Sequence, residues 1–122
     1  MLRMLQGRKH TVYTGVTLVK IQQAPDSNSR LSFDNCVPVS NTQCRETVCF
    51  TETADVYMRA LTDDEIDAYV ATGEPLDKAG AYGVQEKGAV LVERVEGDYF
   101  TVVGLPLSRL CVALKKLGAN IY

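Results

Sequence analysis

The alternation of apolar and polar residues predicts two β-strands in the first half of the chain. Residues 48–58 follow the clearest period of two, with apolar side chains at Val48, Phe50, Ala54, Val56 and Met58. This pattern is typical of a long strand with one buried face. Residues 11–21 are rich in β-branched side chains and carry apolar residues on both faces. They predict a strand inside a covered sheet, in which Gly15 marks a bulge or a close approach of the backbone.

Glu52 interrupts the apolar face of the strand predicted at 48–58. Three interpretations stay open: a local bulge, a position near the end of the sheet that faces a cleft, or a charge that is paired in the fold. The second of these would give Glu52 a role at a binding site.

From Thr62 onward the pattern becomes helical. Thr62 and Glu65 form a capping box at the start of the helix, and Gly73 ends it. Acidic side chains crowd the first turn, at Asp63, Asp64, Glu65 and Asp67. Because such residues complement the positive end of the helix dipole, we interpret them as solvated side chains rather than as metal ligands.

The last third of the chain predicts a hairpin followed by a helix. Residues 89–95 and 99–103 have strand character and are joined by a short Glu-Gly-Asp turn at 96–98. Residues 104–106 then open a helix with proline in its first turn. Apolar residues recur at helical spacing up to a glycine stop at Gly118.

The remaining segments complete the predicted architecture. Residues 1–5 resemble the last turn of a helix that ends at Gly7, and residues 22–43 predict a long loop or a ragged hairpin to which we assign no function. The order of elements predicts an α/β (α+β) fold with a mixed, twisted β-sheet and flanking helices. We expect a single domain over residues 1–122 and no second domain.

Composition narrows the class of partner. The chain has 122 residues, of which 46% are hydrophobic and 23% charged, and its formal net charge is -2. These are ordinary values for a globular domain, and the absence of a basic field argues against a nucleic acid polymer as partner. The sequence contains no apolar run of membrane-spanning length and no signal peptide, so we expect a cytoplasmic protein with a small-molecule partner and no membrane contact.

Cysteine and histidine usage argues against a metal site in this chain. The cysteines, at Cys36, Cys44, Cys49 and Cys111, lack C-x-x-C spacing, and His10 is the only histidine. We expect free thiols. A disulfide between Cys36 and Cys44 is the alternative, which a cytosolic setting disfavours.

The stretch from Gly73 to Gly88 carries most of the candidate chemistry. Four glycines within sixteen residues let the backbone reach positive φ or approach a ligand closely. Lys78 is a mobile cation suited to phosphate, and the Gln85 amide can donate and accept hydrogen bonds at once, as recognition of a nucleobase edge requires. An ordinary connecting loop without a ligand is the alternative interpretation.

Three segments closely resemble the Maf family, the septum-formation-inhibitor-like nucleoside triphosphate pyrophosphatases. They are GRKHTVYTGVTL at 7–18, EIDAYVATGEPLDKAGAYGVQ at 65–85 and GAVLVERVEGDYFTVVGLPLSRL at 88–110, and they occur in the family's order. The motif GEPLDKAGAYGVQ is the most specific part of the match.

The resemblance implies a fold, a reaction and a set of site residues. The implied fold is the inosine-triphosphatase-like Maf fold, with the nucleotide in a cleft between two lobes. The implied reaction hydrolyses a nucleoside triphosphate (dTTP, UTP or a modified nucleotide) to the monophosphate and pyrophosphate, with Mg²⁺ or Mn²⁺ as the divalent cation. Gln85 stands at the family's position for substrate selection, and Asp77, Lys78 and Tyr82 are the further substrate-binding residues. Glu86 stands where the family often has glycine, which would alter the rim of the base pocket.

The resemblance also implies that the chain is the C-terminal half of a Maf domain. The family's Asp-Thr-Val/Ile segment with its general base, its Ser-Pro-Arg-Arg loop and its Lys-Pro lysine do not occur in these residues. We therefore expect no catalytic residue in this chain, cation ligands mainly in the missing N-terminal half, and poor hydrolysis. Two alternatives stay open: a non-catalytic nucleotide-binding or assembly module that pairs as a homodimer, and a Met1 that is not the true start.

Overall fold

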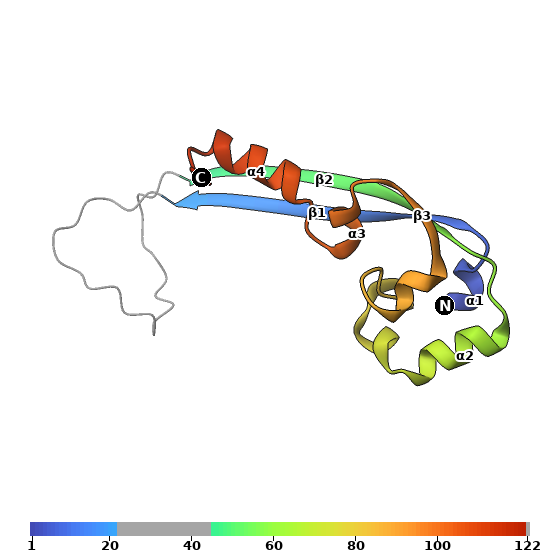
Figure 1. The fold of residues 1–122 in the computed structure, drawn as a ribbon. Coiled ribbons are helices and arrows are strands. Elements are labelled where there is room, and N and C mark those ends of the chain that lie inside the picture. Colours follow the sequence, from blue (N-terminus) through green and yellow to red (C-terminus); the bar gives the residue numbers. More distant parts are fainter. Residues whose placement is uncertain (22–44, 122) are drawn as a thin grey trace, which may run out of the picture.

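The centre of the molecule is a three-stranded sheet. The structure is a computed structural model that describes residues 1–21 and 45–121. Its strands lie in the order β1 (Lys9–Ile21), β2 (Arg45–Met58), β3 (Val92–Gly97). β1 and β2 form a long antiparallel hairpin, and β3 joins only the end of β2 that lies near α2 (Figure 1). The predicted α+β class is confirmed. Where the sequence predicted a mixed sheet, both described pairings are antiparallel.

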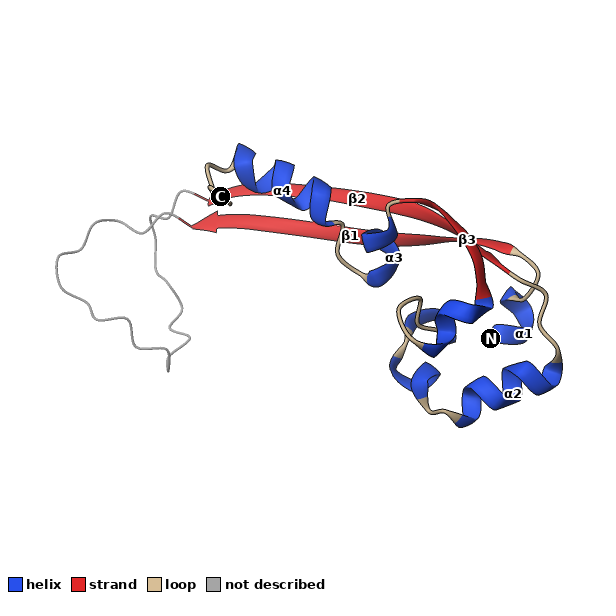
Figure 2. Ribbon diagram, viewed as in Figure 1, coloured by secondary structure: helices blue, strands red, loops and turns tan. Residues whose placement is uncertain are grey.

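Helical segments gather at one end of the hairpin, and α4 packs against β1 further along (Figures 1 and 2). They are α1 (Leu2–Leu5), α2 (Asp63–Ala71), α3 (Tyr99–Val103), α4 (Leu107–Lys116) and three short 3-10 helices, η1 (Glu74–Asp77), η2 (Ala79–Ala81) and η3 (Lys87–Leu91). The core lies where the short segments meet the base of the sheet, and it contains Leu2, Val56, Met58, Leu61, Ile66, Tyr69, Tyr82 and Leu91. The α1 helix and the positive φ of Gly7 agree with the prediction for residues 1–7.

Burial alternates along the hairpin, as the period-two pattern of β2 predicted. Val56 and Met58 are buried on the inner face. The outer face is open, because Tyr13, Val19 and Ile21 of β1 are 70%, 51% and 55% exposed. The prediction that β1 lies inside a covered sheet is therefore wrong for the described chain. The prediction fails because helices α3 and α4 contact only the inner side of the sheet. The β-branched residues of the other side therefore stay in solvent.

The predicted bulge or close approach at Gly15 is also wrong. Gly15 pairs with Thr51 in a register that continues without interruption from Lys9 to Ile21. A Cβ atom built on Gly15 would meet nothing within 4 Å. The position lies on the open outer face, where neither a partner nor a bend requires glycine.

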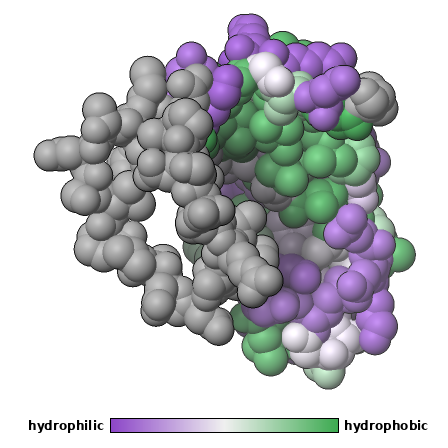
Figure 3. Space-filling view, turned by 90° about the vertical axis from the view of Figure 1, so that its left-hand side faces the viewer, coloured by the Kyte–Doolittle hydropathy of each residue, from purple (hydrophilic) through white to green (hydrophobic). Residues whose placement is uncertain are grey.

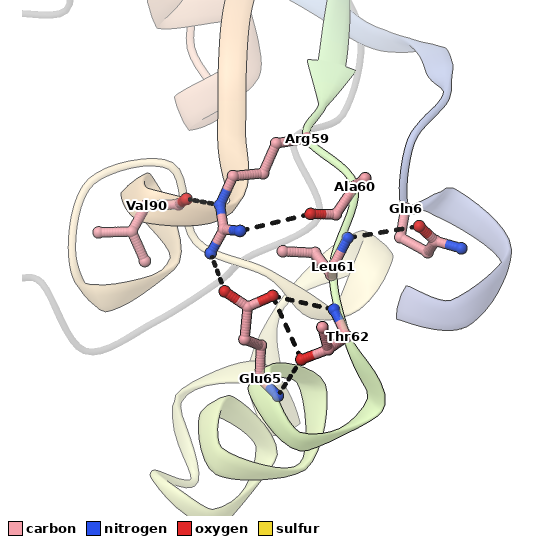
Figure 4. A network of polar contacts seen from close by, with 7 residues as sticks. All are labelled: Gln6, Arg59, Ala60, Leu61, Thr62, Glu65 and Val90. Carbon is pink, nitrogen blue, oxygen red and sulfur yellow. Dashed lines mark hydrogen bonds and ion pairs between the residues drawn. The ribbon is translucent and has the colours of Figure 1, made fainter.

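A polar network around Arg59 fixes the start of α2 (Figure 4). Thr62 and Glu65 form the predicted capping box, in which Thr62 Oγ1 accepts from the Glu65 N–H at 3.2 Å and a Glu65 oxygen accepts from the Thr62 N–H at 2.9 Å. The Arg59 guanidinium donates to Glu65 at 2.8 Å and to the Val90 carbonyl at 2.7 Å. The network therefore joins the segment after β2 to the start of α2 and to η3, which ends the loop between α2 and β3.

Residues 99–103 form helix α3 and not the predicted second strand of a hairpin. β3 pairs with β2 instead, and its last residue, Gly97, has a φ of 110°. The Asp98 carboxylate then accepts hydrogen bonds from the backbone N–H groups of Phe100 and Thr101. This N-cap satisfies the first backbone donors of a helix and outweighs the strand propensity of the segment.

Other predicted features occur with small shifts. The strand expected from residue 89 begins at Val92, and Pro106 is the N-cap of α4 rather than part of its first turn. Gly118 follows the end of α4 with a φ of 82°, as expected of a stop residue. Of the three interpretations of Glu52, the paired charge is confirmed, since Glu52 forms an ion pair with Arg109 of α4. Figure 3, which views the molecule from the left-hand side of Figure 1, shows a patch of apolar side chains bordered by hydrophilic ones.

Some predictions lie outside the described residues. These are the loop at 22–43 and the alternative disulfide between Cys36 and Cys44. Cys49 and Cys111 are described, and both are free thiols. In the described ranges, every helix is too short or too polar to cross a bilayer.

Candidate functional site

A pocket of about 660 Å³ opens between the base of β1, the loop after α2 and the C-terminal end of α3. Its walls come from residues 10–14, 74–86 and 101–104. The predicted substrate-binding residues Asp77, Lys78, Tyr82 and Gln85 all line this one pocket. The sequence therefore located one wall, while the fold adds the walls from β1 and α3.

The carboxylate of Glu74 holds the loop in shape. It accepts hydrogen bonds from the Tyr69 hydroxyl at 2.9 Å and from the backbone N–H groups of Lys87 at 3.1 Å and Gly88 at 2.9 Å. The Tyr69 hydroxyl in turn accepts from the Gly83 N–H at 3.0 Å. Desolvation acts to raise the pKa of Glu74, but these hydrogen bonds outweigh it and hold the pKa below its usual value. Glu74 is therefore an ionised carboxylate whose hydrogen bonds join the two ends of the loop.

The backbone of the loop uses the freedom that its glycines predicted. Gly80 has a φ of 79°, and it is followed by Ala81, which also has a positive φ, of 61°. This left-handed pair turns the chain between Lys78 and Tyr82, so that both side chains line the same pocket. The interpretation of the stretch as an ordinary connecting loop stays the alternative.

Lys78 and Gln85 line the pocket with polar groups that have few partners. The Lys78 ammonium lies 3.7 Å from the Asp77 carboxylate, and the two side chains are 40% and 80% exposed. Because so exposed an ion pair is weak, the ammonium can turn to another anion at little cost. Gln85 is exposed, and its amide makes no hydrogen bond with any described residue. Its donors and acceptor are therefore available to a ligand.

His10 and Tyr82 form a neutral wall of the pocket. His10 Nε2 lies 2.8 Å from the Tyr82 hydroxyl oxygen, and the two rings pack edge to face with centroids 5.5 Å apart. Burial raises the pKa of Tyr82 to about 12. Burial also lowers the pKa of His10, although the charge of Asp55 acts weakly in the opposite direction. Both side chains are thus uncharged at neutral pH, and this wall presents aromatic surface with a single hydroxyl.

His10 and Glu74 belong to the site but are not among the residues predicted for it. As the single histidine, His10 has too few companions for a zinc site, but the period of two places it on the same face of β1 as Val12 and Thr14, which also line the pocket. That periodicity was the available signal. Nothing in the sequence pattern pairs Glu74 with Gly88, because their contact depends on how the loop closes.

The donor set does not fit a resident metal ion. Within residues 1–21 and 45–121, no three His, Cys, Asp or Glu side chains lie together in a way that could hold one. The acidic residues at the start of α2 have other partners, since Arg3 forms ion pairs with Asp63 and Asp67. Of the three carboxylates that line the pocket, Glu74 holds the loop, Asp77 pairs with Lys78, and Glu86 is the third.

Comparisons with known proteins agree with the features of the pocket loop. The family model described as Maf-like protein matches residues 1–117. A dTTP/UTP pyrophosphatase of Moorella thermoacetica is 47% identical over 122 residues, which are 100% of this chain and 52% of that protein. Proteins of the same name from Methanosarcina mazei and Agathobacter rectalis are 43% and 42% identical, with 51% and 50% of their lengths covered. The chain thus spans about half the length of the curated relatives it matches. Because the family model covers nearly all of its residues, the chain belongs to the Maf-like protein family.

Proposed function

We propose that this chain forms the nucleotide-recognition part of a Maf-type nucleoside triphosphate pyrophosphatase. The observation that carries the proposal is the convergence of Lys78, Tyr82 and Gln85 on one pocket. Its volume, about 660 Å³, lies within the range of small-molecule sites. The substrates we propose are dTTP, UTP or modified pyrimidine nucleotides, in keeping with the names of the relatives.

Each polar group has a proposed task. Gln85 reads the edge of the base, because an amide offers a donor and an acceptor together. Lys78 releases Asp77 and contacts the phosphates, for which a compact and mobile ammonium is suited. The neutral aromatic wall of His10 and Tyr82 packs against a flat part of the ligand.

We further propose that these 122 residues hydrolyse nucleotides poorly by themselves. Attack on a phosphoanhydride needs a base that activates water and charges that neutralise the leaving group. The family motifs expected to supply them do not occur in this sequence. The resemblance implies Mg²⁺ or Mn²⁺, but the described residues do not fit a resident cation site. The tasks given to Lys78 and Gln85 do not depend on one.

Calorimetric titration of the 122-residue chain with dTTP, UTP, dATP and dGTP tests the proposal. We expect the pyrimidine nucleotides to bind more tightly than the purine nucleotides. Gln85→Ala should weaken pyrimidine binding about three- to tenfold and reduce this discrimination, because one neutral hydrogen-bonding group is lost. Lys78→Ala should weaken binding of all four about tenfold or more, because a hydrogen bond to a charged group is lost.

Lys116→Ala is the matched control for charge, since Lys116 is exposed on α4 and is not part of the pocket. It should bind all four nucleotides as the wild type does. A Gln85→Ala variant with unchanged affinities and unchanged base preference would contradict the proposed role of the amide. Pyrophosphate release by the isolated chain at the rate of a complete enzyme would contradict the proposed loss of hydrolysis.

A second candidate function is assembly. The outer face of β1 exposes Tyr13, Val19 and Ile21, and we propose as the alternative that two copies of the chain cover these faces in a homodimer. A nucleotide-binding monomer would favour the first function, and a tight dimer without nucleotide binding would favour the second.

A further inference from the structure

The histidine of the pocket has one satisfied and one unsatisfied ring nitrogen. His10 Nε2 lies 2.8 Å from the Tyr82 hydroxyl oxygen. His10 Nδ1 is buried and has no hydrogen-bond partner among the described residues. Because the ring is neutral, one nitrogen carries a hydrogen and the other carries a lone pair. The two possible tautomers have different consequences for Tyr82.

The unsatisfied nitrogen decides between these tautomers. With hydrogen on Nδ1, the ring would bury an N–H donor without an acceptor, and Tyr82 would donate its own hydrogen to Nε2. With hydrogen on Nε2, Nδ1 is only an acceptor without a donor, and Tyr82 accepts from the ring. Among backbone groups, buried N–H donors without partners are rarer than under-satisfied acceptors, and we apply the same order to the two ring nitrogens. The contacts therefore favour hydrogen on Nε2.

This tautomer leaves the hydroxyl hydrogen of Tyr82 without an acceptor in the described chain. We infer that His10 is a positioning residue, which occupies a lone pair of the Tyr82 oxygen and turns the hydroxyl hydrogen toward an oxygen acceptor of the bound nucleotide. The inference rests on the proposed function, because both residues line the proposed nucleotide pocket. It adds Tyr82 to the pocket as a specific neutral hydrogen-bond donor, beside the Gln85 amide and the Lys78 ammonium.

Packing supports a fixed direction for this hydroxyl. The Tyr82 side chain is only 7% exposed and belongs to the buried core. Its ring meets that of His10 at 85°, and Gly80 lies close enough that an added Cβ would be 3.3 Å from Tyr82 Cε1. The phenol also keeps its hydrogen at any physiological pH, since its pKa is about 12. Tyr82 is therefore a held and permanently protonated donor.

The single histidine makes the first half of the inference directly measurable. In a ¹⁵N-labelled chain, two-bond ¹H–¹⁵N correlation spectra report which ring nitrogen carries hydrogen, and here every imidazole signal comes from His10. We expect the Nε2–H tautomer at neutral pH in the free protein. Hydrogen on Nδ1 would overturn the inference, and this measurement needs no variant.

Tyr82→Phe tests the second half, with UTP as the probe. We expect about three- to tenfold weaker binding, because one hydrogen bond to the ligand is lost while the ring remains. Tyr99→Phe removes the hydroxyl of a residue that does not line the pocket, and it should bind UTP as the wild type does. Titration with uridine and with pyrophosphate distinguishes the acceptor: a penalty for uridine alone assigns a base or sugar oxygen, and one for pyrophosphate alone assigns a phosphate oxygen.

Replacement of the histidine separates positioning from simple packing. His10→Gln retains an N–H donor for the Tyr82 oxygen, and we expect it to keep more UTP affinity than His10→Leu, which retains none. Thermal melts of each variant show whether the fold is intact. Equal affinity of Tyr82→Phe and the wild type would overturn the inference while leaving the proposed function in place. If the wild type binds no nucleotide, the proposed function fails, and the proposed donation to the ligand fails with it.

Discussion

At Gly88 the backbone lies directly against the loop that carries the binding residues. A Cβ atom there would lie 2.3 Å from the Gly83 carbonyl oxygen and 2.6 Å from the Tyr69 hydroxyl oxygen. The same approach lets the Gly88 N–H donate to Glu74 at 2.9 Å. Gly88 thus serves the loop in two ways: it lets the backbone approach Gly83 closely, and it donates a hydrogen bond to the ionised Glu74. Only a residue without a side chain fits there.

Gly88→Ala should destabilise the protein by about 1–3 kcal/mol, because the added methyl group meets backbone that cannot move aside. It should also weaken nucleotide binding, since the displaced loop carries Lys78 and Gln85. Gly15→Ala is the matched control and should stabilise the fold by about 0.5–1 kcal/mol, because its Cβ would enter open space. Urea unfolding of both variants measures these changes. A Gly88→Ala protein as stable as the wild type would show that the loop does not close as described.

At the scale of the element, α3 shows how one cap decides a secondary structure. Besides its two backbone bonds, the Asp98 carboxylate accepts a hydrogen bond from Thr101 Oγ1 at 2.9 Å, and Thr101 is fully buried. The Thr101 carbonyl then accepts from Thr14 Oγ1 on β1 at 2.8 Å. The cap of a five-residue helix is therefore linked to a wall of the pocket.

Asp98→Ala should lower the free energy of unfolding by about 1–2 kcal/mol, because the helix loses its N-cap and a buried hydroxyl loses its acceptor. Asp98→Asn keeps one acceptor oxygen and should lose less. Urea unfolding followed by circular dichroism gives both values. The same stability for the alanine and asparagine variants would contradict the cap as the source of the effect.

The elements that the sequence predicted well are those whose signals are local. The capping box at Thr62, the stop at Gly73 and the alternation along β2 each depend on residues within a few positions of one another. The segment at 99–103 was mispredicted because its β-branched and aromatic residues suit a strand, whereas a single carboxylate before it selects a helix. The pairing of β3 with β2, and of His10 with Tyr82, joins distant parts of the chain and has no local signal. The motif indicated the loop that lines the pocket, but no local signal indicated the walls that come from β1 and α3.

At the scale of the whole molecule, the pocket exists only in the folded chain. Its walls come from the start, the middle and the last third of the sequence. The helices that form it pack on one side of the sheet, so the other side of the long hairpin stays open (Figure 1). An open side with exposed Val19 and Ile21 is a surface at which copies of the chain can associate.

We expect the wild-type chain to associate weakly through this face and the Val19→Lys/Ile21→Lys double variant to stay monomeric. Both side chains are about half exposed, so lysine adds charge without disturbing the core. Sedimentation velocity over a range of concentrations measures the difference. Because neither residue lines the pocket, nucleotide affinity should be unchanged. Equal sedimentation of the two proteins at all concentrations would exclude this face as a site of association.

Because β3 pairs with only one end of β2, the two ends of the long hairpin differ in how many strands hold them. From Ala54 to Met58, β2 is bonded on both edges, whereas toward Arg45 its described partner is β1 alone. Amide hydrogens near the far end should therefore exchange with solvent through small openings that leave the base intact. His10 and Val12 pair with Val56 and Ala54, in the doubly bonded part. The hairpin can thus open toward Arg45 while the part of β1 that lines the pocket keeps its geometry.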